Sequence, residues 1–335
     1  MRYKLLGRTG LRVSELCLGT MTFGESWGFG CSKEESTRLF ELFTELGGNF
    51  IDTANRYTEG ESETILGGLI APNRDRYVVA SKYTLSTDLQ DPNANGNHRK
   101  NLVRSVEASL RRLETDYLDV LLVHLWDGTT PVDEVMRALD DLVRSGKVRY
   151  IACSNYEAWR LMEALWISET KNLARFECYQ PQYSLVVRDI EEEIIPVCQL
   201  KGLGVVVWSP LGGGFLTGKY KPGERTAAGT RSAEGWAYPQ RYFAPNADET
   251  LAELLQVAAD LGRTPAQVAN RWVLEQPAIT SAIIGARTVA QARDNFLAGG
   301  WKMPADALAR LDTVSQLARR YPRSMEDPMD ARRNS

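Results

Sequence analysis

The sequence predicts an α/β protein in which eight parallel strands close into a (β/α)8 TIM barrel. Two observations favour this fold. Short apolar runs rich in β-branched residues recur along the chain, and helical patterns separate them. Polar residues gather where these runs end, which is the rim where barrels of this kind carry their chemistry.

The expected elements begin with a β-hairpin at residues 3–16, where Gly-Arg-Thr-Gly joins two short alternating runs. The eight barrel strands are expected at residues 16–20, 49–53, 77–82, 118–124, 149–155, 175–181, 204–210 and 280–285. Helix starts are indicated by Ser32, Asn101, Thr130–Pro131 and Thr264–Pro265.

The chain shows no composition break, so residues 1–335 are predicted to form a single domain with a C-terminal helical extension. Residues 219–247 form the one long irregular stretch, and loops of that length are typical of lids over functional sites. The tail at about 320–335 is expected to be flexible.

Composition narrows the classes of partner. Hydrophobic residues make up 43% and charged residues 25%, the net charge is −3, and no basic block or stripe occurs. We therefore expect a small-molecule partner rather than nucleic acid or a membrane surface. The N-terminus has no signal-like apolar run, and the five cysteines lack metal or disulfide spacing, so a cytoplasmic protein with buried thiols is expected.

Polar side chains follow one predicted strand after another. They are Asp52, Lys82, His124, Ser154, Asn155, Gln180, Trp208 and Ser209, and the last strand runs into Gly285 and Arg287. Taken singly, Asp52 is explained as a turn cap, Lys82 as a solvated lysine and His124 as a core histidine. Their recurrence on neighbouring strands of one rim favours a shared site.

These groups suit the reduction of a carbonyl. Tyr57, in the loop after the second strand, is a weak acid, but a nearby ammonium such as Lys82 stabilises its phenolate. Asp52 would keep Lys82 protonated, and His124 would polarise the carbonyl oxygen of a substrate. No metal site is expected, because His98 and His124 are the only histidines and no carboxylate or thiol cluster joins them.

At these residues the sequence resembles the aldo-keto reductase superfamily. The motifs "GGNFIDTANRYTEGESETILG", "GKVRYIACSN", "YQPQYSL", "WSPLGGGFLTGKY" and "AIIGARTVAQARDN" carry the resemblance, which extends from the hairpin to about residue 320. It implies a (β/α)8 barrel that reduces aldehydes and ketones with NADPH. It also implies a catalytic tetrad of Asp52, Tyr57, Lys82 and His124, with Tyr57 as the general acid.

The resemblance implies a cofactor site as well. Ser154, Asn155 and Gln180 would bind the nicotinamide carboxamide, and Trp208 would stack on the ring. The pyrophosphate would be held by Ser209, Leu211, Gly213, Lys219 and Arg231. Arg287, after Gly285, would bind the adenosine 2′-phosphate, and Gln291 and Asn295 would face adenine.

The sequence departs from the family pattern in two places. Gly285-Ala286-Arg287 replaces the Lys-Ser pair found in many members, as in the branch that contains the potassium-channel β-subunits. The family's "HWPD" after the fourth strand is "HLWDG" here. By position, we expect Met21, Trp27, Trp126 and Trp236 to line the substrate pocket beside Tyr57.

Two other functions stay open from the sequence. A Schiff-base aldolase would use Lys82 as its nucleophile, although a paired Asp52 would hold that lysine charged and inert. A cofactor-binding regulatory or partner module with slow reductase activity is the other, as the resemblance to channel β-subunits suggests. The sequence also leaves an oligomeric assembly open.

Overall fold

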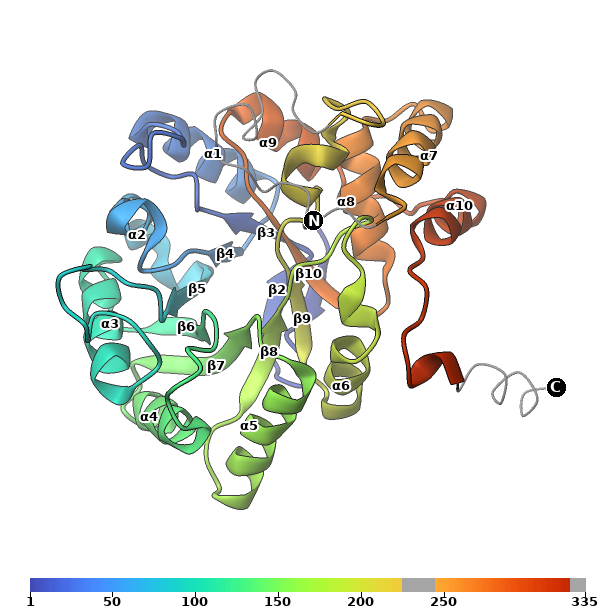
Figure 1. The fold of residues 1–335 in the computed structure, drawn as a ribbon. Helices are drawn as coiled ribbons and strands as arrows, with labels where there is room; N and C mark the ends of the chain where they lie inside the picture. The colour runs from blue at the N-terminus through green and yellow to red at the C-terminus, as the bar shows by residue number, and fades with distance from the viewer. Residues whose placement is uncertain (225–244, 326–335) are drawn as a thin grey trace.

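Eight parallel strands form a closed barrel in the computed structural model, which describes residues 1–224 and 245–325. The barrel order is β10-β3-β4-β5-β6-β7-β8-β9, and Figure 1 shows the strands surrounded by helices. The barrel strands are β3 (Leu16–Gly19), β4 (Phe50–Asp52), β5 (Val78–Tyr83), β6 (Leu118–Val123), β7 (Val148–Ser154), β8 (Phe176–Gln180), β9 (Gly204–Val207) and β10 (Ile279–Ile284). The predicted barrel is therefore confirmed.

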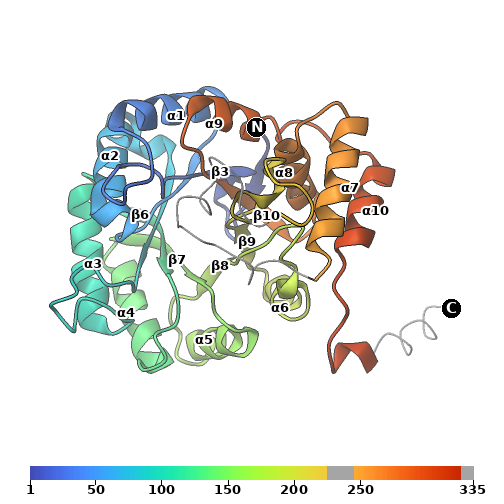
Figure 2. The same ribbon diagram turned by 45° about the horizontal axis from the view of Figure 1, so that its top comes forward.

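Helices follow the strands and cover the outside of the barrel, as the two views in Figures 1 and 2 show. They are α1 (Lys33–Glu45), α2 (Glu61–Ile70), α3 (Arg99–Arg112), α4 (Val132–Arg144), α5 (Ala158–Thr170), α6 (Ile194–Lys201), α7 (Ala247–Asp260), α8 (Pro265–Glu275), α9 (Val289–Phe296) and α10 (Ala305–Ser315). Within the described ranges, no helix combines the length and the apolar character that crossing a bilayer requires.

The predicted N-terminal hairpin lies across the end of the barrel where the strands begin. It consists of β1 (Tyr3–Leu5) and β2 (Arg12–Ser14), which pair antiparallel. Gly7, in its turn, lies so close to the starts of β8 and β9 that a Cβ atom there would approach the carbonyl oxygen of Glu177 to 2.5 Å and the backbone nitrogen of Gly204 to 2.7 Å. The hairpin thus closes this end and leaves the opposite rim for ligands.

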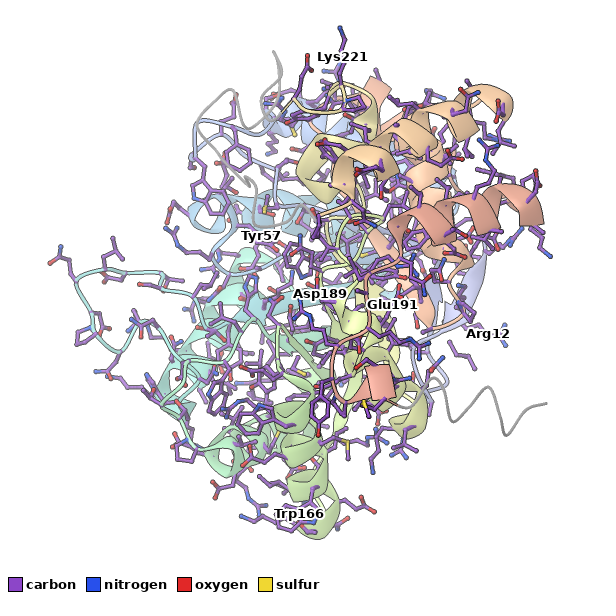
Figure 3. All side chains as sticks on the ribbon, turned by 45° about the vertical axis from the view of Figure 1, so that its right-hand side comes forward. Arg12, Tyr57, Trp166, Asp189, Glu191 and Lys221 are labelled. Atoms are coloured by element: carbon purple, nitrogen blue, oxygen red, sulfur yellow. The ribbon has the colours of Figure 1, made fainter. Side chains whose placement is uncertain are left out.

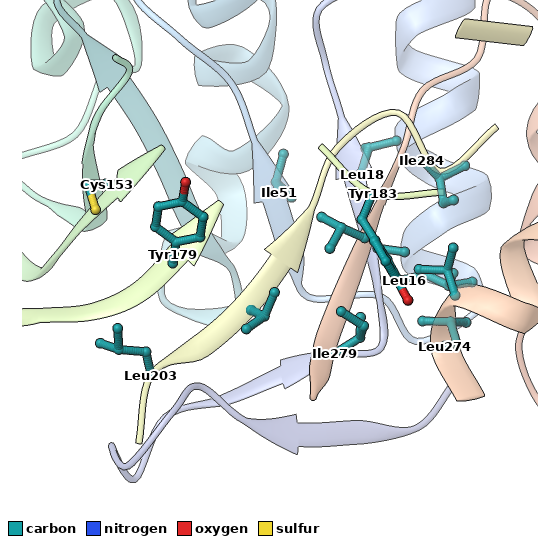
Figure 4. Close-up of a cluster of buried hydrophobic side chains, with 14 of the residues drawn as sticks. Leu16, Leu18, Ile51, Cys153, Tyr179, Tyr183, Leu203, Leu274, Ile279 and Ile284 are labelled. Carbon is teal, nitrogen blue, oxygen red and sulfur yellow. The ribbon is translucent and has the colours of Figure 1, made fainter. Parts of the chain in front are cut away.

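The main core lies between the strands and the surrounding helices. Figure 4 shows Leu16 and Leu18 of β3 beside Ile279 and Ile284 of β10, with Leu274 of α8 packed against them. A second cluster fills the barrel itself with inward side chains such as Phe50 of β4. All five cysteines are buried and free, as the sequence indicated.

Helix caps explain where most, but not all, of the expected helices begin. Ser32 and Thr264 accept hydrogen bonds from backbone N–H groups in the first turns of α1 and α8, as predicted. The prediction that Asn101 caps α3 is wrong. His98 caps this helix through its Nδ1 (3.3 Å from the nitrogen of Asn101), while the Asn101 side chain is buried and donates to the carbonyl oxygen of Gly96 (2.8 Å).

The predicted C-terminal helical extension is α10, which packs beside α7 on the outside of the barrel (Figure 2). Arg310 of α10 donates to Glu253 of α7 at 2.6 Å. The expected flexible tail is described as far as Met325, and Arg323 donates to the carbonyl oxygen of Glu192 at 3.2 Å. Of the expected lid-like stretch, residues 225–244 lie outside the described residues.

Two adjacent glycines of α2 provide a test of the helix packing. A Cβ at Gly67 would lie 2.5 Å from the backbone oxygen of Arg112, whereas a Cβ at Gly68 would meet no atom within 4 Å. Gly67→Ala should lower the free energy of unfolding by about 1–3 kcal/mol through overpacking. Gly68→Ala, the matched control, should raise it by about 0.5–1 kcal/mol because alanine favours the helix. Denaturant unfolding of both variants measures this, and equal effects would contradict the tight packing of α2 on α3.

Candidate active site

A cavity of about 1100 Å³ opens at the rim where the barrel strands end. Its walls come from loops on opposite parts of the barrel. Asp52 ends β4 and His124 follows β6 on one side, and Gly213 and Arg287 follow β9 and β10 on the other. The polar residues that the sequence placed at the strand ends are therefore brought to one space, which is large enough for a dinucleotide and a small substrate.

Asp52 and Lys82 form a buried ion pair at the floor of this cavity. Lys82 Nζ donates to Asp52 Oδ2 at 2.6 Å, and the two side chains are 1% and 4% exposed. The ammonium also donates to the carbonyl oxygen of Thr53 (2.9 Å) and to the hydroxyl of Tyr57 (3.1 Å). Burial lowers the pKa of Lys82, but Asp52 and Tyr57 outweigh it, so the pKa is raised overall. Lys82 is therefore an ammonium in direct contact with a phenol.

The backbone that follows Tyr57 is left-handed over three residues. Thr58, Glu59 and Gly60 have φ angles of 45°, 56° and 90°, and this region costs roughly 1–2 kcal/mol for a residue with a side chain. Thr58 stabilises the turn, because its buried hydroxyl donates to the carbonyl oxygen of Phe23 (2.7 Å) and accepts from the backbone nitrogen of Ser62 (3.0 Å). This turn holds Tyr57, labelled in Figure 3, over Lys82.

His124 directly follows β6 and lies edge-on to Tyr57, with 6.1 Å between the ring centroids. Its Nδ1 is buried without a hydrogen-bond partner. Burial, together with the positive charge of Lys82, lowers the pKa of His124 to about 3. The imidazole is consequently neutral at pH 7, so it can donate a hydrogen bond but holds no extra proton to transfer.

Gln180 links the ion pair to the next part of the rim. Its Nε2 donates to Asp52 Oδ1 at 2.7 Å, so each carboxylate oxygen of Asp52 has a donor. Ser154, at the end of β7, donates its hydroxyl to the carbonyl oxygen of Gln180 at 2.6 Å. Ser154 and Gln180 both line the cavity. The side-chain amide oxygen of Gln180 can accept a hydrogen bond from a ligand there.

Asn155 joins the loops after β6, β7 and β9. Its Nδ2 donates to the backbone oxygen of His124 (2.9 Å), and its Oδ1 accepts from the indole N–H of Trp208 (3.2 Å). Asn155 itself has a φ of 57°, a conformation that asparagine tolerates better than most residues. Trp208 is thereby held on the cavity wall by its edge, which leaves its flat face for a ring.

A glycine-rich turn follows β9. Gly212, Gly213 and Gly214 all have positive φ, and a Cβ at Gly214 would meet no atom within 4 Å. The hydroxyl of Ser209 closes the turn by accepting from the backbone nitrogen of Gly213 at 2.9 Å. Ser209, Leu211, Gly213 and Lys219, the residues predicted to hold a pyrophosphate, all line the cavity. Arg231 lies outside the described residues.

The turn after β10 adds Arg287 to this wall as a second cationic residue beside Lys219. Gly285, Arg287, Gln291 and Asn295 all line the cavity. The first turn of α9 is already satisfied: Gln291 accepts from the backbone nitrogen of Arg287 (3.0 Å), and Glu35 accepts from that of Val289 (2.8 Å). An anion at this turn would therefore meet the Arg287 side chain rather than these two backbone N–H groups.

The substrate side of the cavity is apolar and aromatic. Met21 and Trp27 line it as predicted, and the Trp27 ring lies edge-on to Tyr57 at 6.3 Å. Trp126, which was also predicted to line the pocket, is not among the residues that line the cavity as described. Its ring packs edge-on against Tyr156 (5.9 Å) and under the guanidinium of Arg160 (4.1 Å), outside the cavity. Trp236 lies outside the described residues.

Phe29, Leu85 and Leu125 are among the lining residues that the sequence reasoning missed. Leu125 directly follows His124, and Leu85 lies two residues beyond the end of β5. The rule that strand ends face the site would have found both leucines, but it was applied to polar residues alone. Phe29 stands between Gly28 and Gly30 in the sequence, and this pair of glycines was the available signal. Both glycines have positive φ in the structure.

The sequence model of the Aldo/keto reductase family matches residues 15–316. The chain belongs to this family. Like its named relatives it is an oxidoreductase, and the family supports carbonyl reduction as its general chemistry.

Three relatives illustrate the range of this aldo/keto reductase family. Norsolorinic acid reductase stcV of Emericella nidulans is 39% identical, over 91% of this chain and 79% of the relative. The uncharacterized oxidoreductase YrpG of Bacillus subtilis is 37% identical, over 94% of this chain and 96% of the relative. A putative voltage-gated potassium channel subunit beta of Schizosaccharomyces pombe is 32% identical, over 93% of this chain and 92% of the relative.

The donor set of the aldo/keto reductase cavity fits a nicotinamide dinucleotide. Lys219 and Arg287 supply two cations, and the glycine turn lets a ligand approach its backbone closely, because a Cβ at Gly214 would meet no atom within 4 Å. Gln180 and Trp208 supply an amide and an aromatic face beside the tetrad. A flat polar ring at one end and phosphates at the other would match these groups.

The neutral His124 makes stability depend on pH in a defined direction. The folded protein binds this proton only near pH 3, whereas the unfolded chain binds it below about pH 6.5. Stability should therefore fall as pH decreases from 6.5 towards 3, with a His124 contribution of up to about 1.4 kcal/mol per pH unit.

Denaturant unfolding at pH 7 and pH 5 measures this contribution. His124→Gln should lose less stability over this interval than the wild type. His98→Asn, which keeps a capping side chain on α3, is the matched control and should follow the wild type. Parallel losses in the wild type and His124→Gln would contradict a neutral buried imidazole.

Proposed function

We propose that this protein reduces aldehydes or ketones to alcohols with NADPH, using Tyr57 as the general acid. The observation that carries the proposal is the chain of contacts from Asp52 through Lys82 to the Tyr57 hydroxyl, at 2.6 and 3.1 Å. This chain ends at the apolar side of a cavity whose other side offers cations and a glycine turn.

In this proposal Tyr57 transfers its hydroxyl proton to the carbonyl oxygen of the substrate. NADPH, when bound, supplies the hydride that becomes bonded to the carbonyl carbon. The Lys82 ammonium stabilises the phenolate left on Tyr57, and Asp52 keeps Lys82 charged and oriented. His124, being neutral, donates a hydrogen bond to the carbonyl oxygen and polarises it.

The remaining cavity residues would bind and orient the cofactor. Ser154, Asn155 and Gln180 are proposed to hold the nicotinamide carboxamide, and Trp208 to cover the ring. Ser209, Leu211, Gly213 and Lys219 would hold the pyrophosphate, with Arg231 from the neighbouring segment. Gln291 and Asn295 would face adenine, and Arg287 would bind the 2′-phosphate and so favour NADPH over NADH.

The direct test mixes purified protein, NADPH and a panel of aromatic aldehydes and follows NADPH absorbance. Consumption of NADPH with formation of the alcohol supports the enzyme. Cofactor binding without turnover would instead support a cofactor-binding regulatory or partner module, the alternative that the similarity to a putative potassium channel subunit beta suggests.

Tyr57→Phe should lower kcat by at least ~10²-fold, because the general acid is lost. Its NADPH Kd, measured by fluorescence titration, should stay within about twofold, because the ring remains and no proposed cofactor contact changes. Tyr150→Phe, which removes a hydroxyl at a tyrosine that does not line the cavity, is the matched control. Turnover retained by Tyr57→Phe would rule out this acid.

Arg287→Ala should weaken NADPH binding by roughly 10- to 100-fold, because a charge-assisted contact to the phosphate is lost. NADH binding should change by less than about threefold, since NADH carries no 2′-phosphate. Arg293→Ala, at an exposed position of α9, the helix that follows Arg287, controls for the loss of positive charge. Equal losses for both cofactors would remove Arg287 from the 2′-phosphate.

A further inference from the structure

Arg56 is a charged residue of the cavity that the proposed reaction does not use. The described lining residues include five side chains that carry charge at pH 7: Asp52, Arg56, Lys219, Arg287 and Asp294. The last three belong to the wall formed by the segments that follow β9 and β10. Asp52 is neutralised by Lys82. Arg56 is thus the cationic lining residue beside Tyr57 in the chain, apart from the cations of that other wall.

The structure holds Arg56 in place through Glu59. Glu59 forms an ion pair with Nη1 of Arg56, and its Oε1 accepts from the indole N–H of Trp27 at 3.0 Å. The guanidinium carbon of Arg56 lies 5.8 Å from the centroid of the Trp27 ring, within reach of a cation–π contact. The Arg56 side chain is 29% exposed, so it is fixed at the cavity wall and not folded out into solvent.

Glu59 leaves part of the guanidinium available. A guanidinium has five N–H donors, and the Glu59 ion pair uses one terminal nitrogen. Glu59 itself is half exposed and does not line the cavity, whereas Arg56 does. A second carboxylate approaching from inside the cavity would therefore meet the guanidinium before it met Glu59.

The surroundings indicate what would carry that carboxylate. Met21, Trp27, Phe29, Leu85 and Leu125 line the same cavity, and such a wall packs well against a flat ring. A guanidinium beside an apolar wall matches the geometry of a carboxylate and is screened less by water there than on the open surface. A ring that bears both a carbonyl and a carboxylate satisfies both features.

We propose that Arg56 is a specificity-determining residue that selects aromatic carbonyl substrates bearing a carboxylate on the same ring. The proposal rests on the carbonyl reduction proposed above and names the substrate class for it. Arg56 binds the carboxylate, while Glu59 limits this preference because its own negative charge competes for the guanidinium.

The experiment compares each carboxybenzaldehyde isomer with its methyl ester, which keeps the shape and removes the charge. The readout is the ratio of kcat/KM for the acid to kcat/KM for the ester. In the wild type this ratio should exceed one for at least one isomer. Arg56→Met should reduce the ratio for that isomer by ~10-fold or more, mainly through KM, because a charge-assisted contact is lost.

Glu59→Gln should move the same ratio in the opposite direction. It removes the competing charge, while its amide oxygen can still accept from the Trp27 indole. Arg160→Met is the matched control, because Arg160 also has an i,i+3 glutamate partner and tryptophan contacts but does not line the cavity. This control should leave the ratio within about twofold of the wild type.

The outcomes separate this inference from the proposed function. An unchanged ratio in Arg56→Met, with the ester still reduced, overturns the role of Arg56 and leaves the reductase proposal standing. A ratio lowered by Glu59→Gln also overturns it. If the wild type reduces neither the acids nor the esters nor any other aldehyde of the panel, the proposed function itself fails. Opposite shifts in the two variants support the carboxylate site.

Discussion

The buried ion pair between Asp52 and Lys82 is the constraint on which the site depends. Two charges removed from water are costly unless their remaining hydrogen-bonding groups are also satisfied. Here Gln180 donates to the second oxygen of Asp52, and the Thr53 carbonyl and the Tyr57 hydroxyl accept from Lys82. Satisfying this pair ties β4, β5 and β8 together and fixes the phenol at the same time.

Closure of the barrel brings together the residues of this site, although they are far apart in the sequence. Because all eight strands are parallel, Asp52 and Gln180 end their strands at one rim although 128 positions separate them. The hairpin that blocks the opposite end leaves this rim as the place where the cavity opens. Tyr57 (the proposed acid), Lys82 and the proposed cofactor-binding groups are therefore brought together by their position on the rim and not by proximity in the chain.

Much of this was predictable, because strand periodicity and the polar ends of strands are local signals. The eight strands and the cavity positions of Asp52, Tyr57 and His124 followed from them. Leu125 rather than Trp126 lines the described cavity, because a loop can turn either neighbour of a strand end inward. His98 caps α3 in place of Asn101, because the Asn101 side chain donates a buried hydrogen bond to Gly96 within the first turn. A contact of this kind does not appear in the hydrophobic periodicity of the sequence, so it could not be predicted.

The left-handed turn at residues 58–60 places a limit on how this enzyme could be redesigned. The same turn aims Tyr57 at Lys82 and presents Glu59 to Trp27 and Arg56. A substitution that relaxes its backbone would move the proposed proton donor and the pocket wall together. Directed evolution for new substrates should therefore vary the side chains at Met21, Leu85 and Leu125. Changes there alter the shape of the cavity wall and leave the contact between Tyr57 and Lys82 unchanged.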